Sequence, residues 1–86
     1  MHVSYSKKFK KLYKKSDKQI QQAFDSKILL FLDNQNNPIL NVHRLHGKYS
    51  GFYSLNVTGD IRAVFHKIDF GKIKFVAIGS HSELYS

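Results

Sequence analysis

The sequence predicts an α+β fold in which a helical hairpin covers one face of a small antiparallel sheet. Three observations predict it: apolar residues recur at helical spacing up to residue 32, they alternate with polar residues from residue 51, and a polar segment, Asp33 to Pro38, separates the two patterns. A chain of 86 residues holds one core rather than two. We therefore expect a single domain over residues 1–86, with its elements in the order β-α-α-β-β-β.

The chain begins with an expected short strand, His2 to Tyr5, and a short helix, Lys7 to Lys15, which Ser6 can cap. Apolar residues at positions 9, 12 and 13 give the helix one apolar face. All the remaining positions of this helix are lysines: Lys7, Lys8, Lys10, Lys11, Lys14 and Lys15. Because like charges repel at i, i+4, solubility alone explains the run poorly. We interpret it as a surface that contacts phosphates, with a solvated helix face as the alternative.

A second and more buried helix is expected after Ser16, which we interpret as its N-cap with Asp17 in the first turn. Its apolar stripe begins at Ile20 and Phe24 and is wider than that of the first helix. The polar segment at residues 33–38 ends it. Because only a few residues join the two helices, we expect them to form a hairpin.

Three strands are expected in the second half of the chain, at residues 51–57, 61–68 and 73–79. The segment Asp69-Phe70-Gly71 is interpreted as the hairpin loop between the last two strands. The last strand, IKFVAIG, carries little polarity, so we expect it to be the central strand, covered on both faces. Residues 80–85 are then expected to leave the sheet as a polar tail.

The charge of the chain predicts a polyanionic partner. Lysine and arginine outnumber aspartate and glutamate by 14 to 6, which gives a net charge of +8. Nucleic acid is the first expectation, with an acidic protein or an anionic membrane surface as alternatives. The longest apolar run, Ile28 to Leu32, is far shorter than the roughly 20 residues that span a bilayer. With no signal-peptide core and no cysteine, we expect a soluble cytoplasmic protein that does not bind membranes.

A metal site is not expected. His43 and His46 have a spacing that suits a metal on a helix, but Gly47 and the loop context argue against a helix there. No acidic residue nearby completes a ligand set.

The motifs, taken in order, resemble the RelE/ParE toxin superfamily of bacterial toxin–antitoxin modules over nearly the whole chain. The matching segments are Tyr5-Ser6-Lys7-Lys8-Phe9, His43-x-Leu45-x-Gly47, Gly51-x-x-Ser54, Gly59-Asp60-Ile61-Arg62-x-Val64-Phe65 and Ile78-Gly79-Ser80-His81-Ser82-Glu83-Leu84-Tyr85. The ending, G-[ST]-H-x-x-L-[YF], is the most specific piece and is similar to the YafQ-type branch. The resemblance implies a RelE-like fold and a toxin that cleaves mRNA on the ribosome. It also implies a cognate antitoxin as partner and no small-molecule cofactor.

The resemblance further implies which residues form the site. His43, Asp60, Arg62, His81 and Tyr85 match functional positions of that branch. RNA cleavage of this kind uses the 2′-OH as an internal nucleophile, so it needs a base, an acid and a group that holds the phosphate. His81 is the first choice for acid or base, and His43 and Asp60 compete for the other role, with His46 in reserve.

Arg62 is expected to hold the scissile phosphate, and Tyr85 to stack on a base or bind the phosphate. The lysines of the first helix, with Arg44, His46 and Lys48, are expected to bind ribosomal RNA or message.

Each of these residues also has a structural interpretation. His81 would cap the strand end, His43 and His46 would be loop surface, and Asp60 would shape a turn. Arg62 would pair with Asp60 or Glu83, and Tyr85 would plug the core at the C-terminus.

The sequence departs from the YafQ-type pattern at Asn56, where a histidine is usual, at Ile61, where an aromatic residue is usual, and at Ala77, where an arginine is usual. A catalytically weakened toxin that acts only as a binding partner is therefore one alternative. Another is a ParE-like toxin that poisons DNA gyrase by binding. A tail without ionisable groups would favour gyrase, whereas this tail carries His81 and Glu83.

Overall fold

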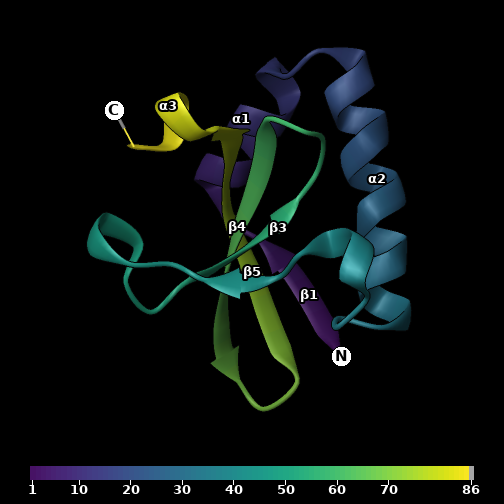
Figure 1. Cartoon of the computed structure of the whole chain (residues 1–86), viewed down its shortest axis with the longest axis vertical. Helices are drawn as coiled ribbons and strands as arrows, with labels where there is room; N and C mark the ends of the chain where they lie inside the picture. Colours follow the sequence, from purple (N-terminus) through teal and green to yellow (C-terminus); the bar gives the residue numbers. More distant parts are fainter. Residues whose placement is uncertain (86) are drawn as a thin grey trace.

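The computed structural model describes residues 1–85 and has an α+β fold (Figure 1). Its elements, in chain order, are β1 (His2–Tyr5), α1 (Lys7–Lys15), α2 (Lys18–Asp33), the 3-10 helix η1 (Pro38–Leu40), β2 (His43–Arg44), the 3-10 helix η2 (Gly47–Tyr49), β3 (Tyr53–Asn56), β4 (Ile61–Asp69), β5 (Lys72–Ser80) and α3 (His81–Tyr85). The predicted fold class is confirmed. The two-residue strand β2 and the helix α3 are additions to the predicted order.

The five strands form one mixed sheet in the order β1-β5-β4-β3-β2. The antiparallel meander β3-β4-β5 is as predicted, and β2 extends it as another antiparallel edge strand. One expectation is wrong: the sheet is not antiparallel throughout, because β1 pairs parallel to β5, with Val3 opposite Ile73. The prediction for the last strand is confirmed in part. β5 lies inside the sheet and is covered on both faces, but the middle strand of the five is β4, because β1 and β2 add to opposite edges of the meander.

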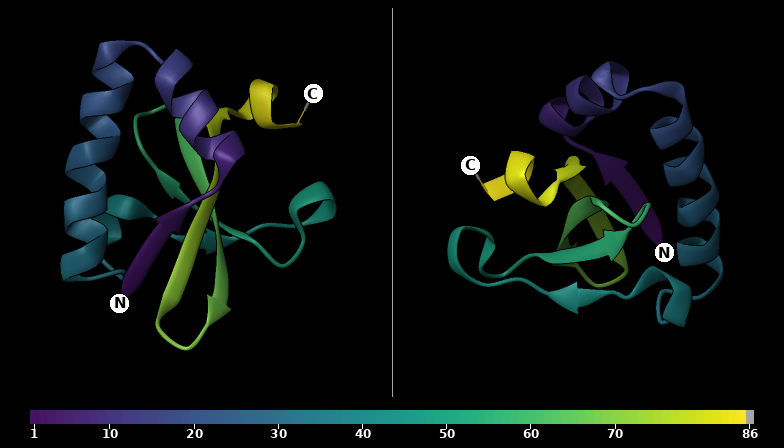
Figure 2. Two further views of the ribbon diagram at one scale, coloured as in Figure 1. Left: turned by 180° about the vertical axis from the view of Figure 1, so that it is seen from behind. Right: turned by 45° about the horizontal axis from the view of Figure 1, so that its top comes forward.

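The main core lies between the sheet and the two long helices, which cover the same face (Figure 2). Phe9 of α1 and Phe24 of α2 are 5.2 Å apart between ring centroids, and both pack on Phe75 of β5. Phe31 meets Phe65 of β4 at 5.1 Å. Aromatic rings at these spacings bury large areas, so this face supplies most of the apolar stabilisation.

The helix caps confirm one prediction and correct another. The Ser6 hydroxyl accepts a hydrogen bond from the Phe9 amide, at 3.0 Å, so Ser6 caps α1 as predicted. The N-cap of α2 is Asp17, whose carboxylate accepts from the Ile20 amide at 3.0 Å. Ser16 instead closes the C-terminus of α1, where its own amide bonds to carbonyls of the last turn. The connection is so short that its two residues have separate roles: Ser16 caps the end of α1 and Asp17 caps the start of α2. The two helices meet there and diverge away from it (Figure 2).

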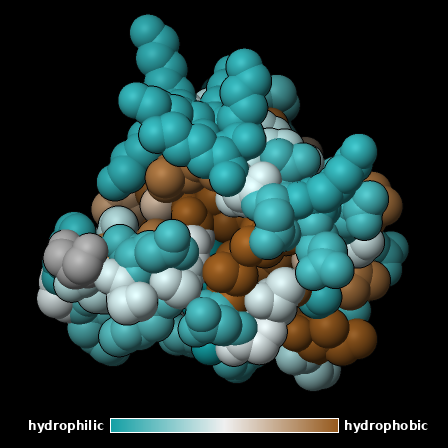
Figure 3. Space-filling model, turned by 90° about the horizontal axis from the view of Figure 1, so that it is seen from above, coloured by the Kyte–Doolittle hydropathy of each residue, from teal (hydrophilic) through white to brown (hydrophobic). Residues whose placement is uncertain are grey.

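A smaller cluster packs on the other face of the sheet. It consists of Tyr49, Val64, Ala77 and Leu84, so η2 and α3 are held against β4 and β5. The molecule seen from above shows hydrophilic side chains around an apolar depression (Figure 3). Within residues 1–85, no helix is long and apolar enough to cross a membrane.

Candidate functional site

A hollow of about 330 Å³ lies on the sheet face that carries the smaller cluster. Its lining includes six of the residues predicted from the sequence: His43, Arg44, His46, Arg62, His81 and Tyr85. They come from β2 and the segment after it, from the start of β4, and from α3. Residues far apart in the chain are thus gathered at one concave surface. We call this hollow the polar site.

The residues expected to form a polar tail form the helix α3 instead, because Ser80 and Glu83 make a capping box. The Ser80 amide donates to the Glu83 carboxylate at 2.7 Å, and the Glu83 amide donates to the Ser80 hydroxyl at 3.2 Å. The backbone hydrogen bond, followed by the bond from the Ser80 side chain, lowers the pKa of Glu83 below its ordinary 4.5. A side chain at Gly79 would come within 3.2 Å of that carboxylate, so glycine leaves room for the cap.

Helix α3 places His81 and Tyr85 one turn apart on the same side. Their ring centroids are 4.7 Å apart with a 31° angle between the planes. Tyr85 also meets Tyr49 edge to face at 5.4 Å. Tyr85 therefore both lines the polar site and packs on the smaller cluster. This position is compatible with both interpretations of Tyr85 made from the sequence, a site residue and a residue that packs on the core.

His43 is held in one orientation by two neighbours. Its Nδ1 lies 2.9 Å from the carbonyl oxygen of Asn41, and its Nε2 lies 3.4 Å from the hydroxyl of Ser54. Because a carbonyl only accepts, Nδ1 carries the proton and Nε2 of the neutral ring keeps its lone pair. Asn41 presents its carbonyl from a left-handed conformation, φ 47°, which asparagine tolerates better than most residues. His43 itself is exposed, and its Nε2 accepts from the hydroxyl of the buried Ser54.

Sequence reasoning assigned no role to Ser54, although the Gly51-x-x-Ser54 motif contains it. Its side chain is 2% exposed and is the one polar or charged residue that is buried in the part of the chain that the structure describes. It faces the polar site, where it lines the hollow beside His43. Successive side chains of β3 point to opposite faces of the sheet, so Ser54 lies on the opposite face from Leu55. This alternation is the sequence pattern from which the position of Ser54 could have been predicted.

Arg62 lies at the start of β4, opposite Asn56 of β3. Its Nη1 donates to the carbonyls of Thr58 and Gly59, at 3.4 and 3.2 Å, which fixes the side chain at the turn between the strands. Arg62 also lines the polar site, and its guanidinium carries a permanent positive charge. Of the residues that differ from the YafQ-type pattern, Asn56 has a buried Oδ1 without a hydrogen-bond partner among the described residues.

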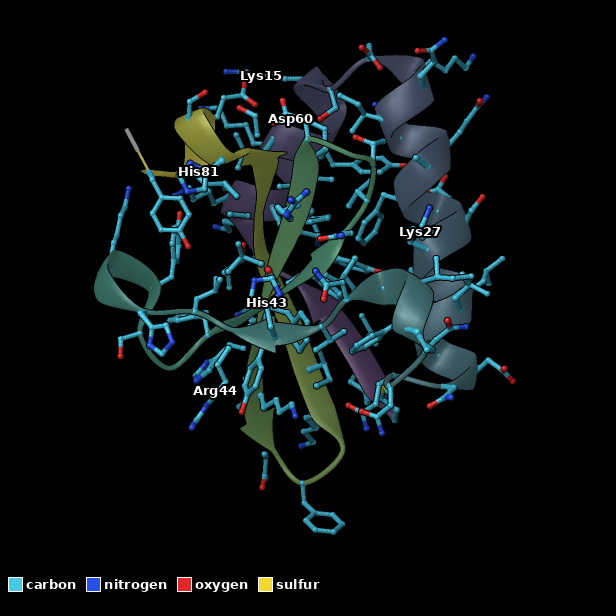
Figure 4. The ribbon with its side chains drawn as sticks, viewed as in Figure 1. Lys15, Lys27, His43, Arg44, Asp60 and His81 are labelled. Carbon is cyan, nitrogen blue, oxygen red and sulfur yellow. The ribbon has the colours of Figure 1, made fainter. Side chains whose placement is uncertain are left out.

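Asp60 does not line the polar site. It is exposed on the turn before β4, and Figure 4 shows it at the end of the molecule away from His43. Its role as base or acid stays a prediction. Lys48 does not line the hollow either, but its Nζ donates to the Leu84 carbonyl at 3.2 Å and so ties η2 to α3. Among residues 1–85, no three His, Asp or Glu side chains are grouped so as to hold a metal ion.

The six lysines of α1 are all exposed but do not form one set. Lys10, Lys11 and Lys14 line a separate groove beside α2, whereas Lys7, Lys8 and Lys15 line neither that groove nor the polar site. Their contact with RNA stays a prediction.

This architecture is that of the RelE/YoeB-like bacterial toxins. YafQ from Escherichia coli strain BL21(DE3) has a similar structure, with a TM-score of 0.81 at 19% identity, covering 98% of this chain and 97% of that one. A YoeB/ParE toxin from Agrobacterium tumefaciens aligns with a TM-score of 0.75 at 15% identity, over 94% of this chain and 99% of the other. At such identities the likeness establishes the fold.

The family follows from the sequence itself. Residues 1–86 match the family described as the bacterial toxin of type II toxin–antitoxin systems, YafQ, and the chain belongs to that family. Among curated proteins, no sequence matches this chain. The E. coli DinJ–YafQ toxin–antitoxin complex is also similar, with a TM-score of 0.78 at 20% identity over 98% of this chain and 96% of that one. In that structure the YafQ protein is bound to its antitoxin.

Proposed function

We propose that this toxin inhibits translation as a ribosome-dependent mRNA endonuclease. The observation that supports the proposal most is the polar site, which gathers three histidines, two arginines and a tyrosine around one hollow. Membership of the YafQ family supports the same conclusion. Cleavage on the ribosome would place the protein in the cytoplasm.

The proposed reaction is attack of the 2′-OH on the adjacent phosphate. His43 takes the proton of the 2′-OH on Nε2 once the Ser54 hydroxyl has turned away from that atom, because the Nδ1–H group already donates to the Asn41 carbonyl. His81 then gives a proton to the departing 5′-oxygen. The new bond joins the 2′-oxygen to phosphorus as the bond to the 5′-oxygen breaks, so a 2′,3′-cyclic phosphate is the first product.

Arg62 is proposed to hold the phosphate oxygens, whose negative charge grows as the reaction proceeds. Tyr85, whose ring lies beside that of His81, offers its ring to a base of the message. The lysines of α1, with Arg44, His46 and Lys48, supply positive charge for ribosomal RNA and message. The proposed inhibitor is a cognate antitoxin, as DinJ is for YafQ.

Primer extension on a translated message tests the proposal. The parent should produce new 5′ ends in the message only when ribosomes are present. His81→Ala should produce none while it stays folded, and His2→Ala should cleave like the parent because His2 is not part of the lining of the polar site. Equal cleavage by His81→Ala would contradict the assignment of His81. Intact message together with a DNA-damage response would contradict the endonuclease proposal and would favour a toxin that poisons DNA gyrase.

A further inference from the structure

The sheet face that carries the polar site continues beyond it, toward the hairpin that joins β4 to β5. On this face Ser54 of β3 is paired with Val64 of β4, and the same register sets Phe52 beside His66. The ring centroids of Phe52 and His66 are 4.7 Å apart, with an angle of 34° between the planes. We call these two side chains the aromatic pair. Neither of them lines the polar site, so the pair is a separate feature of the same surface.

His66 is exposed although it belongs to the middle strand of the sheet. Its imidazole stacks on Phe52 and makes no hydrogen bond or ion pair with the residues that the structure describes, 1–85. Phe52 is half-buried and fixed in place: its ring meets Tyr49 edge to face at 6.1 Å, and its amide donates to the Tyr49 carbonyl at 2.9 Å. The proposed reaction uses neither ring. The surface therefore presents an imidazole that is supported by an anchored ring and has both ring nitrogens free of protein partners.

The charge beside the aromatic pair indicates what binds there. Lys74 of β5 is opposite His66 and lies on the same face, because its neighbours Ile73 and Phe75 point into the main core. The one acidic residue of β4 and β5, Asp69, lies at the hairpin end, where its carboxylate accepts from the amide of the next residue at 2.7 Å. An exposed ring with positive charge alongside is the combination that binds single-stranded nucleic acid, because a base stacks on the ring and a phosphate meets the charge.

The position of the aromatic pair indicates which part of the message reaches it. Phe52 is two residues, or about 7 Å along the strand, from Ser54, whose hydroxyl lies 3.4 Å from His43 Nε2. Figure 4 shows His43 between His81 and the β4–β5 hairpin. In the proposed reaction, His43 acts on the nucleotide that carries the 2′-OH and His81 on the nucleotide that carries the 5′-oxygen. The message therefore extends on its 5′ side toward the aromatic pair.

We propose that the aromatic pair is a subsite for a base of the message on the 5′ side of the scissile phosphate. The base stacks on the exposed imidazole of His66, which Phe52 supports, and Lys74 meets a neighbouring phosphate. The inference deepens the proposed function and rests on it for the direction of the message. Because every base has a face that can stack, this subsite positions the message without selecting its sequence. It holds the 2′-OH in line for attack on the phosphate.

The first test measures binding in the absence of cleavage. The probe is a fluorescein-labelled RNA of about eight nucleotides, with 2′-O-methyl groups throughout so that no 2′-OH can attack, and its anisotropy reports binding to the full-length protein. His66→Ala should weaken binding about tenfold, because one stacked base is lost. Phe52→Leu, which keeps an apolar side chain but no ring, should also weaken it. His2→Ala is the matched control, because His2 is an exposed histidine on the edge strand β1.

His66→Phe separates stacking from the other properties of histidine. It keeps an aromatic ring but loses the imidazole nitrogens, so it should bind the probe within about threefold of the parent. Because His66 is exposed, His66→Ala and His66→Phe should both unfold at the same urea concentration as the parent. A merely structural role for His66 would instead lower that midpoint and leave probe binding unchanged.

The second test locates the base with ribosomes that carry synthetic messages. In each message one nucleotide lacks its base, at the first or second position on the 5′ side of the cleaved bond or at the first position on the 3′ side. One of the two 5′ changes should slow single-turnover cleavage by the parent about tenfold. The same change should slow His66→Ala no further, because the stacking partner is already absent. The 3′ change should slow both proteins equally.

Four outcomes would overturn the subsite. They are probe binding by His66→Ala as tight as by the parent, probe binding by His66→Phe as weak as by His66→Ala, cleavage that no missing 5′ base slows, and a dimer of the parent that His66→Ala dissociates. The proposed function can fail separately. If the parent binds the probe through His66 but leaves message on the ribosome intact, the endonuclease proposal fails and the RNA subsite stands. If it cleaves message without sensitivity to a 5′ base, only the subsite fails.

Discussion

The polar site and the groove between α1 and α2, here called the helix groove, lie on opposite faces of one sheet and differ in chemistry. The polar site presents imidazoles, guanidinium groups and a phenol, and its His43 and Arg62 donate hydrogen bonds to backbone carbonyls. The helix groove presents aromatic rings held by packing, with lysines around them. Hydrogen bonds fix the direction of a polar group, whereas packed rings contribute mainly to the stability of the core. The two faces of the sheet therefore differ in what a substitution is expected to change.

The shared core beneath both regions should give the largest effect. Phe75 is fully buried and packs on Phe9, Phe24, Phe31 and Phe65. We expect Phe75→Ala to lower the free energy of unfolding by about 3–5 kcal/mol, because it leaves a cavity. Cleavage should then fall as the folded fraction falls. Urea denaturation measures the change, with Phe70→Ala as control: the Phe70 side chain is fully exposed, so its loss should cost less than about 0.5 kcal/mol.

Arg62→Ala should separate the two regions most sharply. Losing the group that holds the phosphate should reduce the cleavage rate by about 100-fold or more, since single electrostatic contacts of this kind contribute that much. The free energy of unfolding should fall far less than for Phe75→Ala, because only hydrogen bonds at the turn are lost. Single-turnover cleavage and urea denaturation on the same preparation measure both. A variant that lost stability as much as Phe75→Ala would show that Arg62 acts through the fold.

Ser54→Ala should act on the polar site alone and more weakly. Its hydroxyl lies 3.4 Å from His43 Nε2, and a hydrogen bond contributes about 0.5–1.5 kcal/mol, so we expect a roughly three- to tenfold slower cleavage. Ser50→Ala, an exposed serine of the same segment, is the control. A loss of stability with an unchanged cleavage rate would mean that Ser54 only packs.

Glu83→Ala should give the smallest effect. Losing the cap of α3 should lower the free energy of unfolding by about 0.5–1 kcal/mol. Because the fold lowers the pKa of Glu83, the carboxylate stabilises the folded state above its ordinary value of 4.5, and this contribution is lost as the pH falls through the lower folded value. Thermal melts of parent and variant should therefore differ at neutral pH and converge in acid. A difference that persisted in acid would contradict the capping role.

The sequence predicted those parts of the fold that depend on local patterns. The lysine-rich helix, its Ser6 cap and the alternating strands follow from spacing over a few residues. The parallel pairing of β1 with β5 was missed, because it joins residues about 70 positions apart and no local pattern encodes it. The helix α3 was missed because the residues of its Ser80–Glu83 capping box lie in a short polar segment, and such a segment is also typical of an irregular tail.

The candidate site was predictable to a similar extent. Family motifs named His43, Arg62, His81 and Tyr85, and the structure brings them to one hollow. They also named Asp60, which lies outside it. Ser54 carried no chemical signal of its own and becomes visible only when pairing of β2 with β3 sets it opposite His43. The division of the lysines between groove and free surface likewise depends on where α2 lies beside α1.

The parallel pairing of β1 with β5 sets an order of events during synthesis. The first strand has no partner in the sheet until residues 72–75 have been made, and His81 and Tyr85 follow later still. Chains emerge from the ribosome N-terminus first, so β1 and the two long helices wait unpaired while the rest is translated. The polar site is completed later than the core, because residues 81–85 of α3 follow β5 in the chain. His43, Arg62 and His81 therefore come together only after every strand of the sheet has been made.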